Sequence, residues 1–140
     1  MQSTDDVVDI LARMTLFADI SRSQLEGLSH YFDEVSVEAG QRLLRKGFAG
    51  GGFSVILSGE AAVHVDGEQR MALAPGDFFG EISVLLDEAP TADVVAVTPM
   101  RCLVLSGQDL KRFLLQYPKV MFRLLQAMAQ RLSRPFQWHG

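Results

Sequence analysis

Residues 61–73 read AAVHVDGEQRMAL, and this stretch decides the class of the fold. Before the dipeptide Asp66-Gly67, the residues Ala61, Val63 and Val65 share one face of a strand, and Ala62 and His64 share the other. Alternation with a period of two is typical of a half-buried strand, and Asp-Gly is a strong signal for a two-residue type I′ turn. The stretch therefore predicts an antiparallel β-hairpin.

Short strands are expected on both sides of this hairpin. Nine of the 12 glycines lie between residues 31 and 105, separated by short apolar runs. Such spacing is typical of a sandwich or barrel of many short strands. Phe32, Val35 and Val37 open this region, and the apolar run from Cys102 to Leu105 closes it. We expect a mainly β domain over residues 31–105.

Helices are expected at both ends of the chain. Residues 1–30 have helical spacing, with a capping box at Ser21 and Gln24. Residues 106–134 return to helix, and Pro118 suits the first turn of the last helix. Pro135 should end that helix and leave a tail over 135–140. With no internal repeat or long linker, residues 1–140 are expected to form one domain.

Composition excludes several classes of protein. The hydrophobic fraction of 48% argues against disorder, and the net charge of −4 argues against binding nucleic acid through bulk charge. A single cysteine, Cys102, excludes an internal disulfide and fits a buried core position. No apolar run approaches the ~20 residues that cross a membrane, and no signal peptide is visible. A soluble, cytoplasmic protein without membrane contact is expected.

The helix over 119–133 is too apolar for one buried face. Its apolar arc covers roughly 200°, whereas a surface helix needs a stripe somewhat wider than ~100°. Arg131 interrupts this arc. The arc is formed by Val120, Met121, Phe122, Leu124, Leu125, Ala127, Met128, Ala129 and Leu132. Two interpretations stay open: a helix wedged within its own chain, or the seam of a homodimer.

Three stretches carry a family resemblance. They are GFAGGGFSVILSGE over 47–60, PGDFFGEISVLL over 75–86 and APTADVVA over 89–96. Together they resemble the cyclic nucleotide-binding domain family over nearly the whole chain. The resemblance implies a double-stranded β-helix, or jelly-roll β-roll, with N-terminal helices and two C-terminal closing helices. It also implies a regulatory role in signalling, as in catabolite-activator-type transcription regulators, kinase regulatory subunits and gated channels.

The resemblance places a ligand site in residues 75–96, here called the cassette. It implies that Glu81 accepts a hydrogen bond from the ribose 2′-hydroxyl, that Gly80 lets the sugar approach the backbone, and that Thr91 donates to the cyclic phosphate. A short helix starting near Gly80 would also favour an anion. The candidate ligand-binding residues are Phe79, Gly80, Glu81, Ile82, Ser83, Pro90, Thr91 and Ala92.

The cassette departs from the family at the phosphate-pairing arginine, whose position falls on Pro90. Proline offers neither a charge nor a backbone donor. No Lys or Arg occurs over residues 71–100, which contain Asp77, Glu81, Asp87, Glu88 and Asp93. Loss of one charged hydrogen bond weakens binding on the order of tenfold to a hundredfold. A base from another segment could replace it, and the candidates are Arg45, Arg70 and Arg123.

Simpler roles stay open for several of these residues. Glu81 could cap its own short helix, and the glycines of 47–52 could serve only as turn formers. His30, His64 and His139 lack the spacing of a metal site, so no metal and no cofactor are expected.

Two functions remain. The first is a regulatory sensor that binds cyclic AMP, cyclic GMP or another small ligand in this cassette. The alternative is a ligand-blind domain that acts in dimerisation, through the 119–133 helix, or in another protein interaction. An enzyme is not expected, because no catalytic motif appears. Family members that bind DNA continue into a helix-turn-helix, and this chain stops at Gly140, so no nucleic-acid contact is expected from it alone.

Overall fold

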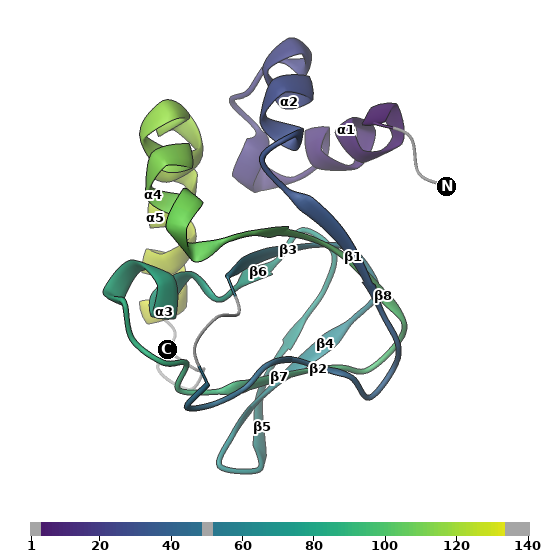
Figure 1. Ribbon diagram of the computed structural model, residues 1–140, viewed down its shortest axis with the longest axis vertical. Helices are drawn as coiled ribbons and strands as arrows, with labels where there is room; N and C mark the ends of the chain where they lie inside the picture. The colour runs from purple at the N-terminus through teal and green to yellow at the C-terminus, as the bar shows by residue number, and fades with distance from the viewer. Residues whose placement is uncertain (1–3, 49–51, 134–140) are drawn as a thin grey trace.

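Two antiparallel sheets pack face to face, and helices cover one of them (Figure 1). The computed structural model describes residues 4–48 and 52–133. The expected tail over 135–140 lies outside these residues, as do the first three residues of the chain.

Each sheet contains four strands. The first has the order β1-β8-β3-β6 and the second the order β2-β7-β4-β5. The strands are β1 (Asp33–Val37), β2 (Arg42–Leu44), β3 (Phe53–Ser58), β4 (Ala61–Val65), β5 (Glu68–Leu73), β6 (Phe78–Phe79), β7 (Asp93–Ala96) and β8 (Met100–Leu105). The mainly β region expected over 31–105 is therefore confirmed, with one short helix inside it, α3 (Glu81–Leu86).

The predicted hairpin joins β4 to β5. Val65 pairs with Glu68, so Asp66 and Gly67 form a two-residue turn. Their φ angles are 52° and 82°, as a type I′ turn requires. The local chemistry of two residues was sufficient to predict this connection.

The central strands divide the interior into two cores. In β3, Val55 and Leu57 face the helices, whereas Ile56 between them faces the second sheet. In the same way, Leu103 in β8 faces the helices and Cys102 faces the second sheet. Burial raises the pKa of the Cys102 thiol to about 11, so it stays protonated and inert at neutral pH.

The helices lie at both ends of the chain, as expected. Before the sheets come α1 (Thr4–Ala12), the 3₁₀ turn η1 (Thr15–Phe17) and α2 (Arg22–Ser29), and after them come α4 (Gly107–Gln116) and α5 (Pro118–Leu132). Both halves of the capping box at Ser21 and Gln24 are formed. Pro118 occupies the first turn of α5, where its missing N–H costs nothing. Figure 1 shows α4 and α5 side by side.

The last helix buries only part of its apolar arc. Val120 and Leu124 are buried against the helical core. In contrast, Phe122, Leu125 and Leu132 are 58%, 62% and 64% exposed. The interpretation of a helix wedged fully within its own chain is therefore wrong, because the described residues leave this face exposed.

Candidate functional site

The cassette begins where β6 turns into α3. Gly80 lies between them with a φ of 89°, in the left-handed region that favours glycine. A Cβ built at this position would lie 2.1 Å from the carbonyl oxygen of Gly52. No side chain fits there. Glycine is thus required by chain packing alone, whether or not a ligand approaches.

Glu81, the first residue of α3, is buried in this turn. Its exposed fraction is 1%, which is rare for a carboxylate. Its Oε2 accepts a hydrogen bond from Nη1 of Arg131 at 3.2 Å. Among the described residues, Oε1 has no hydrogen-bond partner. The carboxylate expected to bind a ribose hydroxyl is therefore already paired with a cation of the same chain.

Arg131 comes from the last turn of α5, 50 residues further along the chain. Its Nη2 donates to the backbone carbonyl of Phe78 at 2.8 Å, and its guanidinium carbon lies 4.3 Å from the centre of the Phe78 ring. Its side chain is only 11% exposed. Planar guanidinium groups suit such combined ionic and stacked contacts. Arg131 thus ties the end of α5 to both sides of Gly80.

The environment of Glu81 opposes its charge. Burial raises the pKa of Glu81 above its usual value. The positive charge of Arg131 and the backbone N–H of Glu81 itself both lower that pKa, but they offset the effect of burial only in part. Among the described residues, the hydrogen bond of the Glu81 carboxylate comes from Arg131, so the helix-capping role weighed for Glu81 gains no support.

The other candidate residues lie in two groups. A cavity of about 70 Å³ collects Gly80, Ile82, Ser83, Pro90, Thr91 and Ala92, together with Leu44, Leu86, Glu88 and Ala89. Phe79 instead packs in the core between the sheets. Glu81 lines a different cavity of about 340 Å³, with Met128 and Arg131 from α5 and Leu85 from α3. The structure thus gathers six of the eight residues and separates two.

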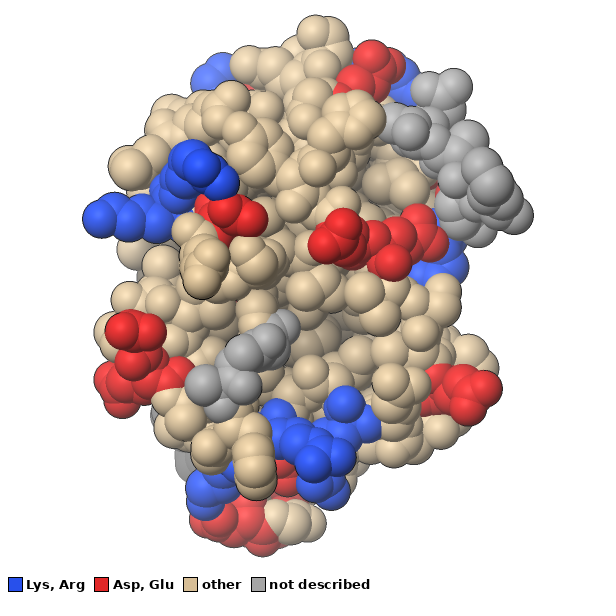
Figure 2. All heavy atoms as spheres, in the orientation of Figure 1, with Lys and Arg blue, Asp and Glu red and all other residues tan. Residues whose placement is uncertain are grey.

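The small cavity does not resemble an anion site. Pro90 is buried in its wall, and its carbonyl accepts a hydrogen bond from the backbone N–H of Gly47. A volume of 70 Å³ is well below the ~300 Å³ at which small-molecule pockets begin. Asp87 and Glu88 at the end of α3 are exposed, and Figure 2 shows acidic side chains at the edge where α3 lies. In this conformation the cavity is too small for a nucleotide.

None of the three proposed substitute bases lines this cavity. Arg70 pairs with Glu68, and Arg123 binds Asp19 through two hydrogen bonds of 2.7 and 3.1 Å. Arg45 is exposed. The base that reaches Glu81 is Arg131, which was not among the three candidates. Its one signal was the break it makes in the apolar arc of the last helix.

Comparison with known proteins agrees with this geometry. The model of the cyclic nucleotide-binding domain matches residues 34–117, from β1 to the end of α4. The chain belongs to the cyclic nucleotide-binding domain family. The family resemblance expected from the cassette is thus confirmed, and with it a sandwich of antiparallel sheets with helices. The matched model describes a regulatory ligand-binding domain rather than a catalytic one.

Three relatives illustrate where this domain occurs. The chain is 30% identical to a cGMP-dependent protein kinase of Caenorhabditis briggsae over 71% of its own length and 14% of the kinase. It is 25% identical to a CRP-like cAMP-activated global transcriptional regulator of Mycobacterium tuberculosis over 90% of its own length and 58% of the regulator. The Thermus thermophilus catabolite activator protein superposes with a TM-score of 0.76 at 27% identity, over 85% of this chain and 58% of that one. The chain thus spans only part of these relatives.

The described residues offer neither a membrane-spanning helix nor a metal-binding cluster. No helix within 4–48 and 52–133 is long and apolar enough to cross a membrane. The same residues contain no group of three His, Cys, Asp or Glu side chains that could hold a metal ion.

Proposed function

We propose that this chain is a regulatory sensor domain whose cassette is held closed by its own last helix. The observation that carries the proposal is the contact of Arg131 with Glu81 and with the carbonyl of Phe78. Arg131 occupies Oε2 of Glu81, so a ligand that takes over this oxygen would displace the guanidinium. Binding would then release the end of α5, so occupancy of the cassette would be transmitted to that helix.

Cyclic nucleotides are expected to be weak ligands of this cassette. The position of the family's arginine holds Pro90, and no base replaces it in the small cavity. The cyclic phosphate would therefore meet an apolar wall and exposed acids. The strand order within the two sheets supports the jelly-roll description, in which the cassette faces the open end of the sandwich.

Replacing Pro90 with arginine is expected to raise the affinity for cyclic AMP or cyclic GMP about tenfold to a hundredfold. The new guanidinium would pair with the phosphate in a charged hydrogen bond. Calorimetric titration of both nucleotides measures the change. Pro90→Ala is the matched control, because it removes the ring without adding a charge, and thermal unfolding shows whether each variant is folded.

Two results would contradict this proposal. One is micromolar binding of a cyclic nucleotide by the unaltered chain, since the closed cassette should then not exist. The other is a folded Pro90→Arg variant whose affinity equals that of Pro90→Ala, since the missing charge would then not limit binding.

A second candidate function is dimerisation through α5. The observation that favours it is the exposed apolar face of Phe122, Leu125 and Leu132 on this helix. Leu115 of α4 is also 64% exposed. Several apolar residues with such high exposure along one helix are typical of an association surface. A second copy of the chain would bury this face along the twofold axis of a dimer.

Replacing Leu125 with glutamate is expected to convert a dimer into a monomer. A charge in the centre of the seam would be buried without a partner in each copy, and related by symmetry to an identical charge. Light scattering after gel filtration measures the mass of each species. Gln126→Glu is the control, since it adds the same charge at an exposed polar position next to Leu125. If the unaltered chain is monomeric at high concentration, the dimer proposal is wrong.

A further inference from the structure

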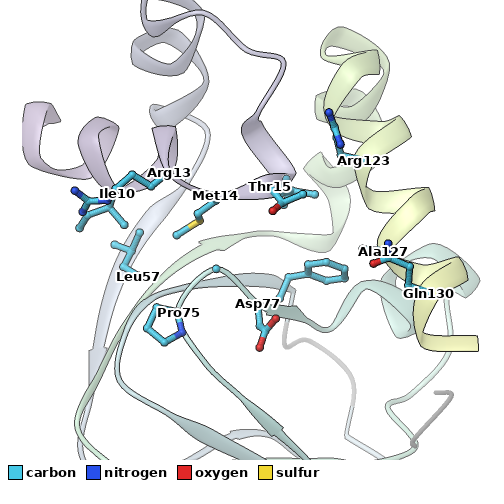
Figure 3. Close-up of a pocket in the computed structure, with 13 residues that line it drawn as sticks. Ile10, Arg13, Met14, Thr15, Leu57, Pro75, Asp77, Arg123, Ala127 and Gln130 are labelled. Carbon is cyan, nitrogen blue, oxygen red and sulfur yellow. The ribbon is translucent and has the colours of Figure 1, made fainter. Parts of the chain in front are cut away.

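A third cavity lies between the N-terminal helices and α5, and residues 75–78 at the start of the cassette form part of its wall. Its volume is about 560 Å³, and it shares no lining residue with the small cavity at Pro90 or with the cavity at Glu81. Figure 3 shows that its walls come from the end of α1, the turn before β6 and the outer part of α5. A cavity of this size falls within the range of small-molecule sites.

The walls differ in chemistry from one end to the other. Met14, Leu57 and Pro75 form an apolar wall towards α1, with Arg13 at its outer edge. At the other end, Thr15 and the α5 residues Arg123 and Gln130 line the cavity, and Figure 3 shows them on the α5 side of the view. Phe78 and Ala127 also line the cavity, and Figure 3 shows Ala127 beside Gln130 on α5. A ligand with an apolar body and one polar group would match this division of the walls.

The charges of the walls favour a negative polar group. Arg123 uses Nε and Nη2 to bind Asp19, which leaves Nη1 outside that bridge. Arg13 lines the cavity as well, and within the described part of the chain no ion pair of its side chain is found.

The opposing charge is Asp77. Its Oδ2 accepts a hydrogen bond from the backbone N–H of Ala74. Figure 3 shows its carboxylate pointing away from α1 and α5. Two arginines therefore line the cavity, Arg13 beside Ile10 at the α1 end and Arg123 at the α5 end, against one carboxylate that is engaged elsewhere.

We infer that this cavity binds a small amphipathic organic anion of the medium-chain carboxylate class. The carboxylate would lie near Nη1 of Arg123, with the Thr15 hydroxyl and the Gln130 amide as further donors. The aliphatic chain would extend over Phe78 towards Met14 and Leu57. This site shares no lining residue with the cavities at Pro90 and at Glu81, and it does not rest on the proposed function.

The test is a titration of the isotope-labelled chain with octanoate, followed by amide NMR. Saturable shifts are expected at residues 13–16, 75–78 and 123–130. Octan-1-ol, which has the same chain length without the charge, is expected to bind at least tenfold more weakly, because it forms no charged hydrogen bond. Equal affinity for the two probes would overturn the assignment of an anion.

Variants on α5 test the location of the site. Ala127→Trp should fill the cavity and weaken octanoate binding at least tenfold. Ala129→Trp makes the same change at an exposed position of the same helix and should leave the affinity unchanged. Arg123→Gln should weaken binding about tenfold. The inference fails if shifts instead map to residues 80–92 or to the face of Leu125, or if no saturation is reached at millimolar octanoate.

Discussion

Replacing Arg131 with methionine is expected to lower the free energy of unfolding by about 3 kcal/mol at neutral pH. Methionine keeps the apolar stem but leaves Glu81, which is 1% exposed, as a buried carboxylate without a cation. Breaking one side of a buried ion pair is among the most destabilising single changes. The carbonyl of Phe78 would also lose its donor. Urea unfolding measures the loss.

Two variants separate this effect from general damage to α5. Arg123→Met removes another arginine of the same helix, but its bridge to Asp19 is exposed to solvent, so a much smaller loss is expected. Glu81→Gln combined with Arg131→Met removes both charges and should recover most of the stability. If the double variant is as unstable as Arg131→Met alone, the buried charge is not the cause.

The loss should also depend on pH. Because burial raises the pKa of Glu81 in the folded state, the folded chain takes up a proton at a higher pH than the unfolded chain. Stability therefore falls as pH rises from the ordinary glutamate value, 4.5, to the raised folded value, and is constant above it. Without Arg131 the folded pKa rises further. The destabilisation in Arg131→Met should thus be largest at neutral pH and shrink in acid.

A flat pH profile would contradict this account. The measurement is the unfolding free energy of the unaltered chain, Arg131→Met and Glu81→Gln between acid and neutral pH. Glu81→Gln is expected to lack this component of the pH dependence, because its amide does not titrate.

Replacing Gly80 with alanine is expected to lower the free energy of unfolding by about 3 kcal/mol or more. The left-handed φ of 89° by itself costs an alanine roughly 1–2 kcal/mol. The added Cβ would also lie 2.1 Å from the carbonyl oxygen of Gly52, so either β3 or the turn into α3 must move. Thermal and urea unfolding measure the loss.

Gly67 provides the matched control. Its φ of 82° is nearly the same, but a Cβ built there meets nothing within 4 Å. Gly67→Ala should therefore show the backbone strain alone, about 1 kcal/mol. If the two variants lose equal stability, the close approach of Gly80 to Gly52 does not exist in solution.

Several elements were predictable because their causes are local. The turn at Asp66-Gly67 depends on two residues that tolerate positive φ, and the start of α2 depends on Ser21 and Gln24, three residues apart. The alternation of apolar residues similarly determined which side chains of a strand share a face. In each case the interacting groups are neighbours in the chain, so their spacing in the sequence is sufficient to predict the local structure.

The place of the cassette in the chain was predictable, but the pairing of its side chains was not. Its motif placed Gly80 and Glu81 at the turn into α3, and the substitution at Pro90 was visible in the sequence. That Arg45, Arg70 and Arg123 stay away from the small cavity, and that Arg131 reaches Glu81 instead, was not. The position of Arg131 within the apolar arc of the last helix does not indicate that its side chain will stack on Phe78 at the end of β6.

The sequence by itself determined the class of fold, the family and the absence of Lys and Arg over residues 71–100, because these follow from residue types and short spacings. Only the tertiary structure decided that Glu81 is buried and paired, that one face of α5 stays exposed and that a separate cavity opens beside Phe78. The reason is physical. Burial, ion pairing and cavity shape depend on which segments meet across the sheets, and residues 50 positions apart carry no periodic signal of that meeting.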